Sequence, residues 1–152
     1  MKLLIERILK AGTLISTIGF VGSTLIQIYA RFFLASAPSW TEESARFFFV
    51  YAMSFAAGLA MKDNYFVHLD VLYSKMKEKY QRTVDIVISF SVLTLFGILG
   101  VFGVQYVILG IPESSPSLGL PMSIAFGSIV LMSQSIGFYA FYELKTNLKK
   151  NQ

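Results

Sequence analysis

Four long uncharged stretches divide the chain, and its charged residues gather between them. The first stretch runs from Ala11 to Ala30, the third from Ile86 to Pro112, and the fourth from Ser114 to Tyr142. Twenty helical residues rise about 30 Å, the thickness of the hydrocarbon core of a bilayer. The pattern predicts an all-α integral membrane protein with a single membrane domain over residues 1–152. Four transmembrane helices are expected, near residues 11–32, 40–61, 86–110 and 120–142.

The second span is the shortest. Only 15 uncharged residues, 47–61, lie between Arg46 and Lys62. A helix that begins at Ser39 is long enough to cross the bilayer, and it places its first polar turns in the outer interface.

Lysine and arginine positions set the expected orientation. Of the 13 Lys and Arg residues, eleven fall in the N-terminal segment, the middle loop or the C-terminal tail, and two, Arg31 and Arg46, fall on the other side. Positive charge is enriched on the cytoplasmic side of membrane proteins. We therefore expect both termini to be cytoplasmic.

The composition agrees with a membrane protein. Charged residues make up 14% of the chain, against about a quarter in soluble domains. The net charge of +4 comes from residues at the ends of apolar stretches. This placement fits membrane topology and contact with lipid, and no nucleic-acid partner is expected.

The chain lacks the residues that most membrane chemistry requires. It has no cysteine and a single histidine, His68, which excludes thiol redox chemistry and a haem held by two histidines. No catalytic constellation, cofactor site or metal site is predicted, so we do not expect an enzyme. The first, third and fourth uncharged stretches contain no Asp, Glu, Lys, Arg or His, which argues against an autonomous ion-coupled pump.

Small or polar residues form one face on the first, third and fourth predicted helices, in the fourth at Ser123, Gly127, Gln134 and Gly137. Such faces let helices approach closely in lipid, where the hydrophobic drive for association is weak. They either pack the four helices together or dock another membrane protein, and both interpretations remain open. The candidate positions are Gly12, Ser16, Gly19 and Ser23 in the first helix, and Gly97, Gly100 and Gly103 in the third.

The richest polar cluster opens the second helix. Trp40 is a natural interfacial anchor, and Arg46 can pair with Glu42 or Glu43 at helical spacing. Ser39 with Glu42 fits a capping box. The cluster is either a well-capped helix start or, as we infer from two acids and an arginine at this depth, a site for partner docking and assembly.

The sequence pattern of the middle loop predicts an amphipathic helix over residues 67–80, on the cytoplasmic membrane surface. Apolar residues, Leu72 among them, recur there at helical spacing beside several lysines. His68 and Asp70 lack a further ligand and favour structural hydrogen bonding over metal chemistry.

The chain resembles the small membrane subunit of TRAP (tripartite ATP-independent periplasmic) transporters, the DctQ-like proteins. The resemblance covers almost the whole chain. It is carried by Trp40-Thr41-Glu42-Glu43 with Arg46, by Gly58, by the segment from His68 to Leu72, and by Ser117-Leu118-Gly119-Leu120-Pro121.

The resemblance implies a role as a scaffold subunit in a bacterial cytoplasmic (inner) membrane. The implied partners are a large multi-span TRAP membrane subunit, which binds sodium and moves an organic anion, and a periplasmic substrate-binding protein. Sialic acid and dicarboxylates are the implied substrates.

Two alternatives stay open from the sequence. One is the small subunit of a tripartite tricarboxylate transporter, which has a similar number of spans. The other is a self-contained homo-oligomeric channel or small transporter, whose pore Gln27, Gln105 and Gln134 would line.

Overall fold

The computed structural model describes residues 2–34, 38–62 and 78–149, which form four α-helices. Within these ranges there is no strand, only an isolated antiparallel bridge between Ser114 and Pro121. All four helices are long and apolar enough to cross a membrane, so the predicted all-helical architecture is confirmed. The helices are α1 (Lys2–Phe33), α2 (Ser39–Lys62), α4 (Glu78–Leu109) and α5 (Met122–Lys149).

The helices extend beyond the uncharged stretches. α1 begins at Lys2 and α4 at Glu78, each several residues before the predicted span. Lysine and glutamate are good helix formers, so a charged residue marks the edge of the membrane without ending the helix. Stretches that could span a membrane are Leu3–Phe33, Ser39–Lys62, Thr83–Leu109 and Met122–Asn147.

The start of α2 differs from the predicted capping box. Ser39 and Glu42 form no reciprocal capping bonds. Instead, the backbone N–H and the hydroxyl of Thr41 both donate to the Pro38 carbonyl, at 3.2 and 2.7 Å. The carboxylate of Glu42 bonds Arg46, one turn further along α2.

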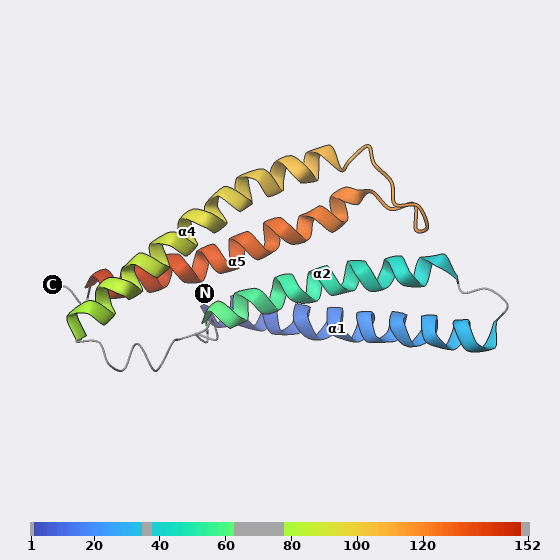
Figure 1. The fold of residues 1–152 in the computed structure, drawn as a ribbon, viewed down its shortest axis with the longest axis horizontal. Coiled ribbons are helices and arrows are strands. Elements are labelled where there is room, and N and C mark those ends of the chain that lie inside the picture. Colours follow the sequence, from blue (N-terminus) through green and yellow to red (C-terminus); the bar gives the residue numbers. More distant parts are fainter. Residues whose placement is uncertain (1, 35–37, 63–77, 150–152) are drawn as a thin grey trace.

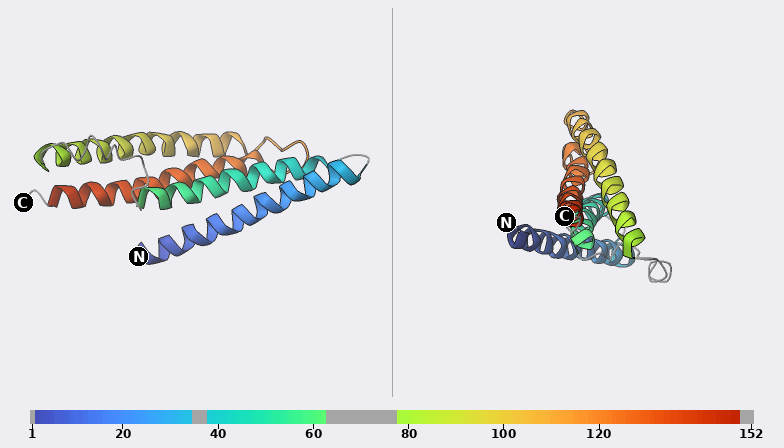
Figure 2. Two further views of the ribbon diagram at one scale, coloured as in Figure 1. Left: turned by 60° about the horizontal axis from the view of Figure 1, so that its bottom comes forward. Right: turned by 90° about the vertical axis from the view of Figure 1, so that its left-hand side faces the viewer.

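The helices form a row of two hairpins. α1 packs on α2, α2 packs on α5, and α5 packs on α4, as Figures 1 and 2 show from three directions. α1 and α4 therefore lie at the two ends of the row. α1 begins and α5 ends at one end of the molecule, which we call the terminal end. The opposite end, where α1 gives way to α2 and α4 to α5, is called the loop end.

Two glycines of α1 leave space that aromatic rings of α2 occupy. A Cβ at Gly12 would lie 2.7 Å from the ring of Phe55, and one at Gly19 would lie 2.6 Å from the ring of Phe48. The two glycines are seven residues apart in α1, and the two phenylalanines are seven residues apart in α2. The same contact therefore repeats along one antiparallel interface. Ser16 and Ser23, between and beyond them, are buried on the same face.

α2 and α5 approach each other closely at Gly58. A Cβ there would lie 2.7 Å from the Cβ of Ser135 and 3.1 Å from Leu9 of α1. Two turns towards the loop end, the Tyr51 hydroxyl donates to the Ile124 carbonyl at 2.6 Å. This side-chain bond ties the two hairpins together.

The apolar core lies near the terminal end. Its buried side chains come from α1, α2 and α5, and α4 adds partly buried residues around them. The buried set is Leu9, Met61, Ile136, Tyr139 and Ala140.

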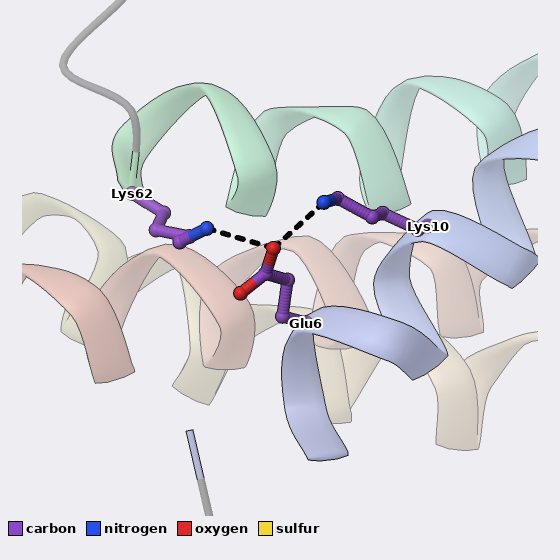
Figure 3. A network of polar contacts seen from close by, with 3 residues as sticks. All are labelled: Glu6, Lys10 and Lys62. Atoms are coloured by element: carbon purple, nitrogen blue, oxygen red, sulfur yellow. Dashed lines mark ion pairs between the residues drawn. The ribbon is translucent and has the colours of Figure 1, made fainter. Parts of the chain in front are cut away.

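An ion-pair network closes the α1–α2 hairpin at the terminal end. Glu6 Oε1 lies 2.7 Å from Lys10 Nζ, one turn along α1, and 2.9 Å from Lys62 Nζ on the last turn of α2. Figure 3 shows both lysines converging on one carboxylate oxygen.

We predict that Gly58→Leu destabilises the fold, whereas Gly22→Leu does not. A leucine at residue 58 must displace Ser135 of α5, which costs about 1–3 kcal/mol for an overpacked site. A Cβ at Gly22 would meet nothing within 4 Å, and both changes bring the same gain in helix propensity. Equilibrium unfolding, by titrating SDS into dodecylmaltoside micelles, measures the difference. Equal midpoints for the two variants would contradict close packing at Gly58.

Candidate docking site at the loop end

Glu43 braces the segment that joins α4 to α5. Its Oε2 accepts hydrogen bonds from the backbone N–H groups of Ser117 at 2.9 Å and Leu118 at 2.8 Å. The bonds link the second turn of α2 to residues more than seventy positions later in the chain. Charge-assisted bonds of this kind are roughly twice as strong as neutral ones.

The braced segment is folded on itself. The N–H of Ser115 donates to the Leu120 carbonyl at 2.8 Å, and that of Gly119 donates to the Ser115 carbonyl at 3.0 Å. Gly119 has a φ of 65°, a left-handed conformation that glycine adopts without steric cost. The turn leaves two successive N–H groups, at Ser117 and Leu118, pointing at one carboxylate oxygen, a typical backbone anion site.

The other residues of the predicted cluster lie on the surface. The exposed side chains of Glu42 and Arg46 form an i,i+4 ion pair at 2.5 Å, and Trp40 is 43% exposed. The cluster is thus divided: Glu43 points inward to the α4–α5 segment, whereas Trp40, Glu42 and Arg46 are presented outward. An exposed ion pair contributes at most about 1 kcal/mol. The pair between Glu42 and Arg46 can therefore be broken at low cost, so that each side chain can bind a partner protein.

Comparison with known proteins places the chain in a family. Residues 20–150 match the family described as the DctQ component of tripartite ATP-independent periplasmic transporters. The chain belongs to the DctQ family. This is a family of transporter subunits rather than of enzymes, and the family predicted from the resemblance is confirmed. The tripartite tricarboxylate and self-contained channel hypotheses are therefore not retained.

Two relatives illustrate the match. A Haemophilus influenzae protein, provisionally named a TRAP transporter small permease protein, is 22% identical over 147 residues, covering 97% of this chain and 89% of the relative. The isethionate TRAP transporter permease protein DctMQ of Oleidesulfovibrio alaskensis is 30% identical over 97 residues, 60% of this chain and 15% of that much longer protein. The name DctMQ joins a DctQ part to a larger permease part, which agrees with the work of DctQ proteins beside a large TRAP membrane subunit.

The remaining predicted residues lie elsewhere in this DctQ chain. Gly12, Ser16, Gly19 and Ser23 all lie on the α2-facing side of α1. On α4, a Cβ at Gly103 would lie 3.2 Å from Ile129 and Val130 of α5, and one at Gly100 would lie 3.5 Å from Ser133. Gly97 is different: a Cβ there would meet nothing within 4 Å, so it packs against none of the other described helices. His68, Asp70 and Leu72, with residues 67–77 of the predicted amphipathic helix, lie outside the described residues, and residues 78–80 belong to α4.

The three glutamines proposed as pore residues do not converge on one another within the described chain. Gln27 is half-buried on α1, whereas Gln105 and Gln134 are exposed on α4 and α5. Gln105 follows Gly103 by two residues, and Gly103 faces α5, so the side chain of Gln105 is directed away from that helix.

Sequence reasoning did not identify the Glu6 network or the partners of Glu43. Glu6 is the one acidic residue before Glu42, and its spacing from Lys10 signals an ion pair. Its contact with Lys62 requires the antiparallel α1–α2 pairing, which no local pattern reveals. Within the described ranges, no three His, Cys, Asp or Glu side chains form a group that could hold a metal.

We predict that Glu43→Ala loosens the α4–α5 segment, whereas Glu42→Ala does not. Loss of a charge-assisted bond of about 1.5–3 kcal/mol should speed amide exchange at Ser117 and Leu118 at least about tenfold. Glu42 is the matched control because its carboxylate pairs within its own helix. Hydrogen–deuterium exchange with peptide-level mass spectrometry measures both variants. Unchanged protection at these amides in Glu43→Ala would contradict the brace.

Proposed function

We propose that this DctQ-family chain is the static scaffold of a sodium-coupled, binding-protein-dependent secondary transporter for organic anions. In this proposal it holds the large TRAP membrane subunit in the bacterial inner membrane and helps dock the soluble binding protein. Both termini are cytoplasmic, and the loop end faces the periplasm.

The observation that carries the scaffold role is the absence of charge inside the helices. Residues 11–30, 47–61, 86–112 and 114–142 contain no Asp, Glu, Lys, Arg or His. Charged or titratable side chains within the membrane are expensive in lipid and mark the transport paths of ion-coupled carriers. Their absence supports a chain that positions the transport subunit while the transport chemistry takes place in that partner.

The loop end supports the docking role. Glu43 fixes the α4–α5 segment against α2, so the exposed Trp40, Glu42 and Arg46 stand beside a braced surface. A preorganised surface loses less conformational entropy when a partner binds. The excess of positive charge at the opposite end supports a periplasmic loop end.

The substrate class is supported by family resemblance alone, since no residue of this chain is assigned to substrate. Organic carboxylates are the proposed class, and sialic acid is the first candidate within it.

We expect uptake only from the complete system. Proteoliposomes that contain this chain with its large subunit, the binding protein outside and an inward sodium gradient should accumulate labelled N-acetylneuraminate or a dicarboxylate. Omission of this chain or collapse of the sodium gradient should abolish uptake, because the gradient supplies the energy. Saturable flux through this chain alone, or uptake that is independent of sodium, would overturn the proposal.

We expect the triple variant Glu42→Gln, Glu43→Gln, Arg46→Gln to weaken docking of the binding protein. The concentration of binding protein that gives half-maximal uptake should rise about fivefold, as expected when interface charges are removed. The control is Arg7→Gln with Lys145→Gln, two exposed positions near the terminal end. If complex yield and uptake in the triple variant equal those of the wild type, these residues have no docking role.

A further inference from the structure

One exposed polar side chain lies deep in the uncharged part of α5. Gln134 is exposed, and among the described residues its carboxamide has no hydrogen-bond partner. The nearest charged residue along the helix is Glu143, nine positions on, which corresponds to about 13 Å of helical rise. The amide therefore cannot reach the membrane surface by extending its side chain.

An amide in this position is unfavourable if only lipid surrounds it. Acyl chains offer neither donor nor acceptor, and an unpaired polar group in hydrocarbon costs several kcal/mol. Polar side chains on membrane helices are instead typically bonded across a helix–helix interface. Gln134 thus points to a protein neighbour that supplies both a donor and an acceptor.

The contacts on either side of Gln134 show where that neighbour lies. Ser133 faces Gly100 of α4, and Ser135 faces Gly58 of α2. Successive helical residues are about 100° apart, so Gln134 projects between these two directions, out of the row of helices. No helix of the described chain covers this side of α5.

Two open glycines border the same region. A Cβ at Gly97 of α4, or at Gly137 of α5, would meet nothing within 4 Å. α4 and α5 are antiparallel, with Gly103 opposite Val130 and Gly100 opposite Ser133, so Gly97 lies level with Ile136, the residue before Gly137. Both glycines are within about one helical turn of Gln134 along the axis. Their small size leaves room for another helix to approach closely.

The outward surface at the other end of the row is different. The residues of α1 that point away from α2 form an apolar stripe, apart from Thr17 beside it, which suits contact with lipid. The stripe consists of the exposed Leu14, Ile18, Val21, Leu25 and Ile28.

We propose that the α4–α5 face around Gln134, Gly97 and Gly137 seats a transmembrane helix of the large TRAP membrane subunit, which hydrogen-bonds the Gln134 carboxamide. This inference rests on the proposed function. The family supplies a membrane partner of the required kind, and the polar complementarity of Gln134 selects a protein helix over lipid.

The first test measures affinity for the large subunit. Because the chain has no cysteine, a single Asn151→Cys carries a fluorophore, and energy transfer to the labelled large subunit in bicelles gives the dissociation constant. Gly97→Leu and Gly137→Leu should each weaken binding at least about tenfold by filling the approach surface. Gln134→Leu should weaken it about threefold through one lost interhelical bond. Gly22→Leu, at an equally open glycine of α1, should bind as the wild type does.

The second test identifies the occupant in the otherwise unaltered complex. A photo-crosslinker in Gln134→p-benzoylphenylalanine should capture the large subunit, whereas one at Ile18 should not. If the wild type binds the large subunit but the crosslink joins two copies of this chain or captures lipid only, this inference is overturned and the scaffold function stands. Unchanged binding of the large subunit by Gly97→Leu, Gly137→Leu and Gln134→Leu would likewise overturn this inference and leave the scaffold function standing. If the wild-type chain fails to bind the large subunit, the proposed function falls, and this inference with it.

Discussion

The contact between α2 and α5 joins two hairpins into one structure. Glu43, Tyr51 and Gly58 lie about two helical turns apart on one face of α2, and each meets the α5 side in a different way. At the loop end a carboxylate holds backbone N–H groups, in the middle a phenol bonds a carbonyl, and towards the terminal end a missing side chain permits close approach. In lipid, where apolar burial gives little drive for association, such bonds and close packing must supply the attachment.

The sequence predicts those parts of the structure that depend on local pattern. Uncharged length gives four helices, and the spacing of Gly12 and Gly19 marks the side of α1 that meets α2. Local pattern does not give the order in which the four described helices pack side by side. Gly97 has the same spacing as Gly100 and Gly103 yet meets none of the other helices that the structure describes, because small-residue spacing describes a helix face and not what covers it. Glu43 could be singled out as an acid in a helix start, but its partners at Ser117 and Leu118 depend on tertiary folding.

The division of the polar cluster also follows from tertiary structure. Glu42 and Glu43 are adjacent in sequence, so their side chains point about 100° apart. One therefore turns towards the α4–α5 segment and the other remains beside Arg46 on the surface. In the proposed docking role, rigidity and recognition are assigned to neighbouring residues, because Glu43 holds in place the surface on which Glu42 is exposed.

The arrangement of the helices in a row has an evolutionary consequence. In a square bundle every helix packs on two neighbours, whereas here α1 and α4 each pack chiefly on one neighbour. The buried apolar side chains gather near the terminal end. Most positions must satisfy hydropathy rather than a particular shape, so many apolar residues can replace one another without penalty. An identity of only 22% across 97% of the chain with the Haemophilus influenzae relative is the degree of divergence that such an architecture tolerates.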